Sequence, residues 1–126
     1  MSKTRIAVAG AGYIGQAHMG VAQRSATVEL SAVVDPSPGA KAHADAAGVP
    51  LYASLAELFA KNKPDGVVLA TPNPLHVPQA LECIAARVPM LLEKPIAQTV
   101  EEAERLVRAA DEAEAHAALF ANLGLE

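Results

Sequence analysis

The sequence is poor in several features that mark other classes of protein. Its 126 residues include a single cysteine, Cys83, which excludes an internal disulfide and a cysteine-based metal site. No apolar run approaches the roughly 20 residues of a membrane-spanning helix, and no signal-peptide core precedes the first strand. The net charge is -4, without a block of lysine and arginine. We therefore expect no metal, no nucleic acid partner, no membrane partner and a cytoplasmic location.

The composition also lacks aromatic residues, which make up 3% of the chain, although 52% of it is hydrophobic. The core must therefore consist mainly of alanine, valine, leucine and isoleucine. Such small aliphatic side chains suit helices packed closely on a parallel sheet. A chain of this length corresponds to one domain. Cys83 is interpreted as a small buried residue on a helix.

Short apolar segments alternate with helical patterns along the whole chain. Strands are predicted at residues 5–9, 28–34, 66–70, 88–92 and 117–121, and helices at 14–24, 40–47, 55–63, 78–87 and from 100 onward. Gly48 is placed to end the second helix. The pairs Ser54/Glu57 and Thr99/Glu102 are capping boxes that begin two others. This alternation predicts an α/β fold with a doubly wound parallel sheet over residues 1–126.

The last predicted helix carries a regular apolar stripe. Its members recur at helical spacing and are expected to face the core: Val100, Ala103, Leu106, Val107 and Ala110.

The first strand is followed by a glycine-rich turn of the form G-x-G-x-x-G. Gly10 would allow a tight turn, Gly12 would let a pyrophosphate approach the backbone, and Gly15 would let the helix pack against the sheet. Tyr13 and Ile14 complete the loop where the helix begins, and the helix N-terminus favours an anion. The motif is weak alone, but a strand before it and a helix after it are the context of a dinucleotide site.

Asp35 stands twenty positions after Gly15, at the end of the second predicted strand. A carboxylate there would bind the adenosine ribose and repel a 2′-phosphate, which favours NAD over NADP. Lys41 is an argument against this preference for NAD, because its side chain could reach a phosphate. Asp35 can also be interpreted as a turn residue before Pro36.

Two polar clusters, at residues 70–76 and 93–95, follow the predicted strands at 66–70 and 88–92, which correspond to the fourth and fifth strands of the dinucleotide fold. In the strand order 3-2-1-4-5-6, the carboxyl ends of strands 1, 4 and 5 are neighbours, and ligands lie beyond them. The sequence therefore predicts that both clusters meet the glycine loop at one crevice.

GAGYIGQAH, TPNPLH and EKP, in this order, resemble the glucose–fructose oxidoreductase / inositol dehydrogenase / MocA family. The resemblance extends to about Ala110. It implies an NAD(P)-binding Rossmann domain, joined in the family to a second domain that binds a sugar, inositol or related polyol. The implied activity is hydride transfer between such a substrate and the nicotinamide cofactor.

The resemblance also implies roles for individual residues. Lys94 corresponds to the lysine beside the nicotinamide, which would help relay the proton released with the hydride; its alternative is a solvated loop lysine. Glu93 would contact the nicotinamide ribose or pair with Lys94, and Pro95 would fix the direction of the lysine. The remaining matches are wall residues of the cofactor site and two histidines: Thr71, Pro72, Asn73, His76 and His18. For His76 a helix-start role is as well supported as a catalytic one, and for His18 packing is favoured.

After the last predicted helix the sequence departs from the family. The family's Arg-Phe motif is missing and the substrate domain is absent, so we expect the isolated chain to be inactive. We also expect self-association through the surface that would meet a second domain. The rival hypothesis is a dinucleotide sensor or partner-binding module without chemistry.

Overall fold

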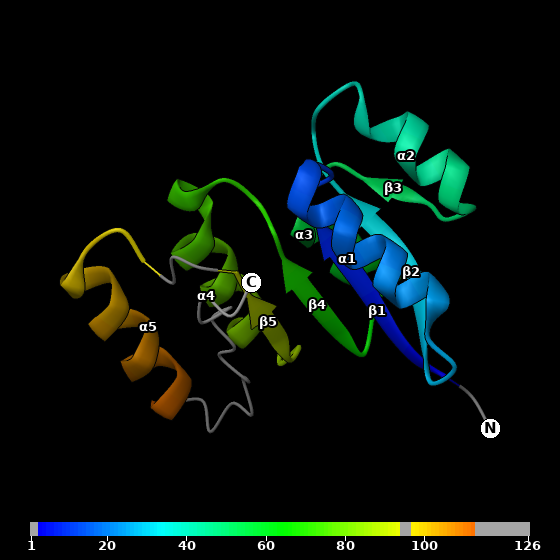
Figure 1. The fold of residues 1–126 in the computed structure, drawn as a ribbon. Coiled ribbons are helices and arrows are strands. Elements are labelled where there is room, and N and C mark those ends of the chain that lie inside the picture. Colours follow the sequence, from blue (N-terminus) through cyan, green and yellow to red (C-terminus); the bar gives the residue numbers. More distant parts are fainter. Residues whose placement is uncertain (1–2, 94–96, 113–126) are drawn as a thin grey trace.

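The computed structural model describes residues 3–93 and 97–112 and contains a five-stranded parallel sheet (Figure 1). The strands lie in the order β3-β2-β1-β4-β5, and every neighbouring pair is parallel. Their bounds are β1 Thr4–Ala9, β2 Val28–Val34, β3 Leu51–Tyr52, β4 Gly66–Leu69 and β5 Met90–Leu92. The predicted doubly wound parallel sheet is confirmed, and four of its strands were predicted; the short strand β3 was not. The predicted strand at 117–121 lies outside the described residues.

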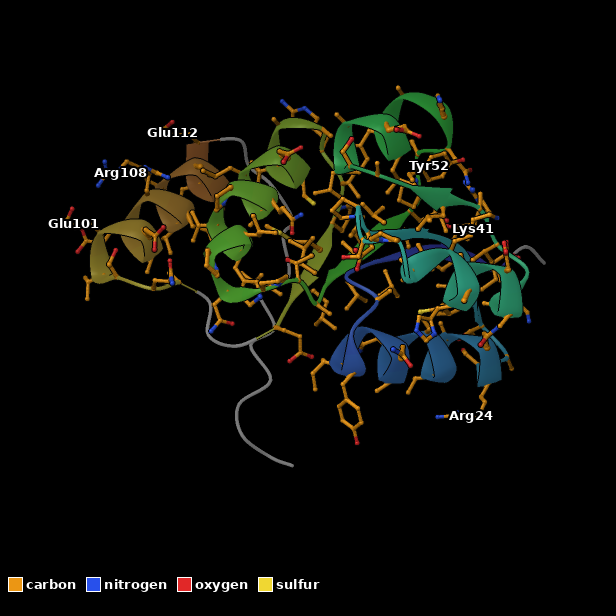
Figure 2. The ribbon with its side chains drawn as sticks, turned by 90° about the horizontal axis from the view of Figure 1, so that it is seen from above. Arg24, Lys41, Tyr52, Glu101, Arg108 and Glu112 are labelled. Atoms are coloured by element: carbon orange, nitrogen blue, oxygen red, sulfur yellow. The ribbon has the colours of Figure 1, made fainter. Side chains whose placement is uncertain are left out.

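Helices cover both faces of the sheet and create a separate core on each (Figures 1 and 2). Helices α1 and α2 pack on one face around Val8, Met19 and Val33. Helices α3 and α4 pack on the other, around Leu58 and Leu69. The bounds are α1 Tyr13–Arg24, α2 Ala40–Ala47, α3 Leu55–Lys61, the 3₁₀ helix η1 Asn73–Leu75, α4 His76–Ala85 and α5 Val100–Glu112.

Cys83 lies in the α4 core and is completely buried, as the sequence predicts. Burial in this apolar layer, together with the nearby Glu82 charge, raises the pKa of the Cys83 thiol to about 12. The described residues contain no helix that is both long and apolar enough to cross a bilayer.

A bulge in β2 changes which residues face each core. Ile6 pairs with Leu30 but Ala7 pairs with Ala32, so Ser31 is an extra residue in the strand. Such an insertion interrupts the alternation of side chains between the two faces. Leu30 consequently belongs to the α1 core, whereas Ala32 belongs to the α4 core. The Ser31 hydroxyl is buried without a hydrogen-bond partner in the described part of the chain.

The predicted helix ends are confirmed in their main features. Gly48 adopts a left-handed conformation (φ 73°) at the end of α2. Ser54 Oγ accepts a hydrogen bond from Glu57 N at 3.2 Å, and Thr99 Oγ1 accepts one from Glu102 N at 3.1 Å. The Glu102 carboxylate, however, accepts from Gln98 N rather than from the Thr99 amide expected of a capping box.

The predicted apolar stripe of α5 is wrong in part. Leu106 is completely buried, but Val100 and Val107 are 73% and 50% exposed. The reason is that α5 packs against α4 at the outer edge of the molecule, so one neighbour covers only part of the stripe (Figure 1). Charged residues at 101, 108 and 112 point away from the body of the protein (Figure 2).

Candidate functional site

A cavity of about 470 Å³ lies at the carboxyl ends of the central strands. This is the edge where the sequence predicts a ligand. The lining comes from the glycine loop, the end of β2 and the segment after it, the residue after β3, the segment after β4, and α4. Its residues are Gly10, Gly12, Tyr13, Ile14, Val34, Asp35, Pro36, Ser37, Ala53, Ala70, Thr71, Pro72, Leu75 and Gln79. The predicted residues Gly15, Asn73, His76 and Glu93 are not in this lining, and Lys94 and Pro95 lie outside the described residues.

Two of the three motif glycines are required by the packing of the chain itself. Gly10 has a positive φ of 98°, and a Cβ added to it would lie 2.5 Å from Ala70 O. A Cβ on Gly15 would lie 1.6 Å from Gly10 O. Both contacts are with backbone atoms, which cannot move aside without distorting the turn. Gly15 therefore lets α1 pack close to the sheet, as the sequence predicts, and Gly10 also lets the turn lie against the backbone after β4, which the sequence did not predict.

Gly12 differs, because a Cβ on it would meet nothing within 4 Å. Its φ of -79° is also accessible to any residue. The chain's own packing therefore does not require glycine at this position, although Gly12 lines the cavity. It is the N-cap of α1, where no side chain caps the helix and the first turn has no acidic residue. The leading amides of α1 can thus take an external anion.

Asp35 follows β2 and bonds to the glycine loop. Its Oδ2 accepts from Ala11 N at 2.8 Å, and its Oδ1 accepts from Ser37 N at 2.8 Å. Burial opposes ionisation of Asp35, but the amides of Ala11 and Ser37 and the Ser37 hydroxyl outweigh it and hold the pKa below its ordinary value. The bond to Ser37 shows that Asp35 is also a turn residue. Each carboxylate oxygen retains a lone pair for a ligand hydroxyl.

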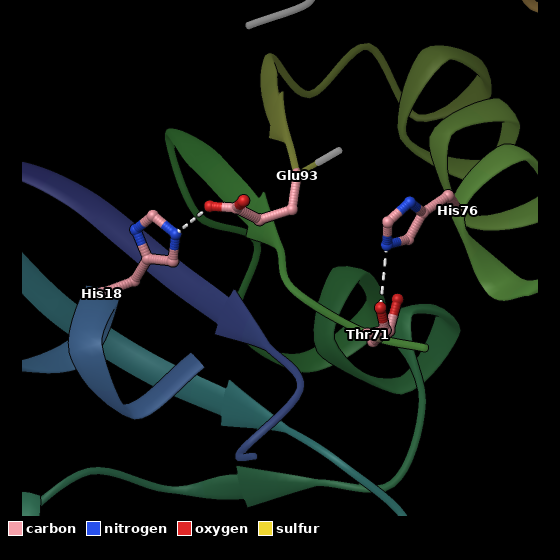
Figure 3. Close-up of polar contacts among 4 residues, drawn as sticks. All are labelled: His18, Thr71, His76 and Glu93. Atoms are coloured by element: carbon pink, nitrogen blue, oxygen red, sulfur yellow. Dashed lines mark hydrogen bonds and ion pairs between the residues drawn. The ribbon is translucent and has the colours of Figure 1, made fainter. Parts of the chain in front are cut away.

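The wall after β4 is held by hydrogen bonds from α4. The Thr71 hydroxyl donates to Gln79 Oε1 at 2.5 Å. His76 is 1% exposed, and its Nε2 lies 2.8 Å from Thr71 O (Figure 3). Because a carbonyl oxygen can only accept, His76 Nε2 carries a proton. The structural interpretation of His76, a helix-start residue bonded to nearby backbone, is therefore realised.

Glu93 follows β5, outside the cavity lining, and contacts α1. Its amide donates to Leu69 O at 3.1 Å, which continues the sheet by one residue. Its Oε2 lies 2.5 Å from His18 Nε2, which comes from α1 (Figure 3). His18 therefore packs through a hydrogen bond with a second motif residue.

Sequence reasoning missed several residues of the cavity wall. Gln79 had a usable signal, because it lies three positions after His76 on the predicted helix. Ser37 follows Asp35 by two positions, the spacing at which an aspartate side chain bonds backbone in a turn. Ala53 had no comparable signal, whereas Leu75 lies within the predicted cluster at residues 70–76. Lys41, considered as a phosphate ligand, instead binds Asp45 on its own helix at 3.0 and 3.1 Å.

Comparisons with known proteins agree with this geometry. The rhizopine catabolism protein MocA of Rhizobium meliloti is 33% identical over 116 residues, which are 92% of this chain and 37% of that protein. Inositol 2-dehydrogenase of Mycolicibacterium smegmatis is 40% identical over 112 residues, 86% of this chain and 32% of that protein. The chain therefore spans about a third of the length of these curated relatives.

A solved structure, that of the WlbA dehydrogenase from Bordetella pertussis with NADH and UDP-GlcNAcA, superposes with a TM-score of 0.84. It is 36% identical, over 90% of this chain and 35% of that one. The model of the family described as "Oxidoreductase family, NAD-binding Rossmann fold" (GFO_IDH_MocA) matches residues 4–120. The chain belongs to this oxidoreductase family, as its NAD-binding Rossmann domain.

Proposed function

We propose that the chain binds NAD across the carboxyl edge of its sheet, with the pyrophosphate beside Gly12. The carrying observation is the open space at Gly12, next to a helix N-terminus that no side chain caps. The dipole of α1 and its leading amides attract a phosphate. A glycine that the protein's own packing does not need is explained by the close approach of a ligand.

The sheet order gives the dinucleotide its direction. Asp35, at the end of β2, takes the adenosine ribose, so the other half of the cofactor must extend over β1 toward β4 and β5. Thr71 and Pro72 line the cavity on that side. The motif residues left for the nicotinamide half are those after β5, Glu93 and Lys94. Tyr13 and Ile14 contribute the first amides of α1.

The same residues favour NAD over NADP. The lowered pKa of Asp35 leaves its carboxylate ionised at neutral pH, where it repels a 2′-phosphate. Lys41, the nearby cation that could offset this repulsion, is engaged by Asp45.

The complete protein would oxidise a secondary alcohol of a sugar, inositol or related polyol, or reduce the matching ketone. Bound nicotinamide supplies the hydride acceptor or donor. Lys94 would hold the reacting hydroxyl and take its proton. The similarity to inositol 2-dehydrogenase and to the WlbA dehydrogenase, which was solved with NADH and UDP-GlcNAcA, supports this substrate class.

Titration of the purified chain with NADH, followed by nicotinamide fluorescence, tests the site. We expect saturable binding of NADH and weaker binding of NADPH. Asp35→Ser should reduce the difference between the affinities for NADH and NADPH, because it removes the repulsion of the 2′-phosphate. Lys41→Gln serves as a control and should change neither affinity greatly. No NADH binding at millimolar concentration would refute the site, and equal affinity for both cofactors would refute the role of Asp35.

A further inference from the structure

The contact between His18 and Glu93 joins two motifs that lie 75 residues apart. His18 lies one turn into α1, four positions after Ile14, and Glu93 lies next to Lys94 after β5. Their side chains are only 25% and 13% exposed, and the two atoms in contact are 2.5 Å apart. An ionised carboxylate can only accept a hydrogen bond, so His18 Nε2 is the donor.

This contact determines where the Glu93 side chain points. A glutamate has three rotatable side-chain bonds, and a half-buried carboxylate needs a partner. Among the described residues, His18 supplies that partner through Oε2 alone. Oε1 therefore remains able to accept a hydroxyl. Figure 3 shows Glu93 directed toward α1 rather than toward His76 and α4.

Glu93 lies after β5, outside the lining of the cavity, on the side toward which the nicotinamide half of the cofactor would extend. Its amide bonds to Leu69 O at the end of β4, and the next residues of β4's extension, Ala70 and Thr71, line the cavity. The adenosine end is assigned to Asp35, on the far side of β1. A hydroxyl near Glu93 would thus belong to the nicotinamide ribose.

We propose that His18 is a positioning residue, which fixes Glu93 so that the carboxylate accepts a hydroxyl of the nicotinamide ribose. This inference rests on the proposed NAD site. His18 itself touches no part of the cofactor in this proposal. A merely structural histidine would instead tie α1 to β5, and its loss would weaken every part of the cofactor site equally.

Truncated ligands separate these two roles. ADP lacks the second ribose, ADP-ribose contains it, and NADH adds the nicotinamide. His18→Leu removes the N–H donor while filling similar space. We expect this change to lower the affinities for NADH and ADP-ribose about tenfold and to leave the affinity for ADP unchanged. A tenfold loss corresponds to the conformational entropy of a long side chain that is no longer held in place. His18→Gln retains an N–H donor and should recover most of the loss. Calorimetric titration measures all three ligands.

Two controls make the result specific. His43 is a half-buried histidine on α2. Its Nε2 lies 3.3 Å from Gln16 Nε2, so its polar contact is with Gln16 and not with Glu93. His43→Leu should leave the ratio of NADH to ADP affinity unchanged. In a Glu93→Ala background, His18→Leu should have no further effect on NADH, because the positioned group is already gone.

Each outcome decides between the alternatives. The positioning role would be overturned if His18→Leu lowered the affinity for ADP as much as that for NADH. It would also be overturned if His18→Leu lowered the affinity for NADH in the Glu93→Ala variant as much as it does in the wild type. If the wild-type chain binds NADH and His18→Leu weakens none of the three ligands, the positioning role is overturned while the proposed function remains intact. If the wild-type chain binds none of the three ligands, the proposed function fails and the inference fails with it. Thermal unfolding of each variant identifies a change that acts by loss of the fold.

Discussion

Replacing Gly12 by alanine should separate ligand binding from folding more cleanly than any other change in the glycine loop. The added methyl group meets no atom within 4 Å, and the backbone conformation (φ -79°, ψ -164°) suits alanine. Alanine lowers the entropy of the unfolded chain, which stabilises by about 0.4–1 kcal/mol. It is also a poorer N-cap than glycine, which costs about as much. The free energy of unfolding should therefore change by less than about 1 kcal/mol.

The affinity for NADH should fall much further. The methyl group would occupy the space in which we place the pyrophosphate, and crowding a close contact by one methyl group costs about 1–3 kcal/mol. That cost corresponds to a loss of roughly 5- to 150-fold in affinity. Urea unfolding measures the first quantity and a fluorescence titration with NADH measures the second.

Three other glycines provide matched comparisons. Gly39 is also an N-cap with nothing within 4 Å of an added Cβ, but it is not in the cavity lining. Gly39→Ala should preserve both stability and NADH affinity. Gly10→Ala and Gly15→Ala should lower the free energy of unfolding by more than about 3 kcal/mol, because their Cβ atoms would overlap backbone atoms. Wild-type NADH affinity in Gly12→Ala would refute the pyrophosphate position, and unfolding of Gly12→Ala would refute the reading of its surroundings.

Further predictions concern acid stability, thiol chemistry and the surface of α5. The pKa of Asp35 is lower in the folded than in the unfolded chain, so its stabilisation is present above about pH 4 and is lost as the pH falls through the folded pKa. Asp35→Asn should therefore make the free energy of unfolding, measured in urea, fall less steeply as the pH is lowered. An unchanged dependence on pH would contradict this. Cys83, with its pKa raised to about 12 by burial, should resist a thiol reagent at pH 8 in the native protein and react in urea; rapid labelling of the folded chain would show the core to be open. Val100 and Val107 leave α5 with an exposed apolar surface, so we expect concentration-dependent self-association that Val107→Lys reduces. Sedimentation velocity tests this, and a wild-type monomer at high concentration would contradict it.

The sequence by itself determined the local structure and the central part of the site. The alternation of strands and helices, the turn at Gly10, the helix end at Gly48 and the spacing from Gly15 to Asp35 depend on neighbouring residues. Such patterns are set by backbone preferences and short-range hydrogen bonds, which a sequence displays directly. The order of the four predicted strands, β2-β1-β4-β5, then followed from the rules of doubly wound sheets, whereas the two-residue strand β3 was not predicted.

The tertiary structure alone decided which side chains meet. The sequence contains both His18 and Glu93, but their contact exists only because α1 packs on the sheet close to the end of β5. In the same way, the position of α5 at the outer edge left Val107 exposed, although its spacing predicted burial. Contacts of this kind depend on how whole elements pack, and neither residue's own sequence neighbours record that packing.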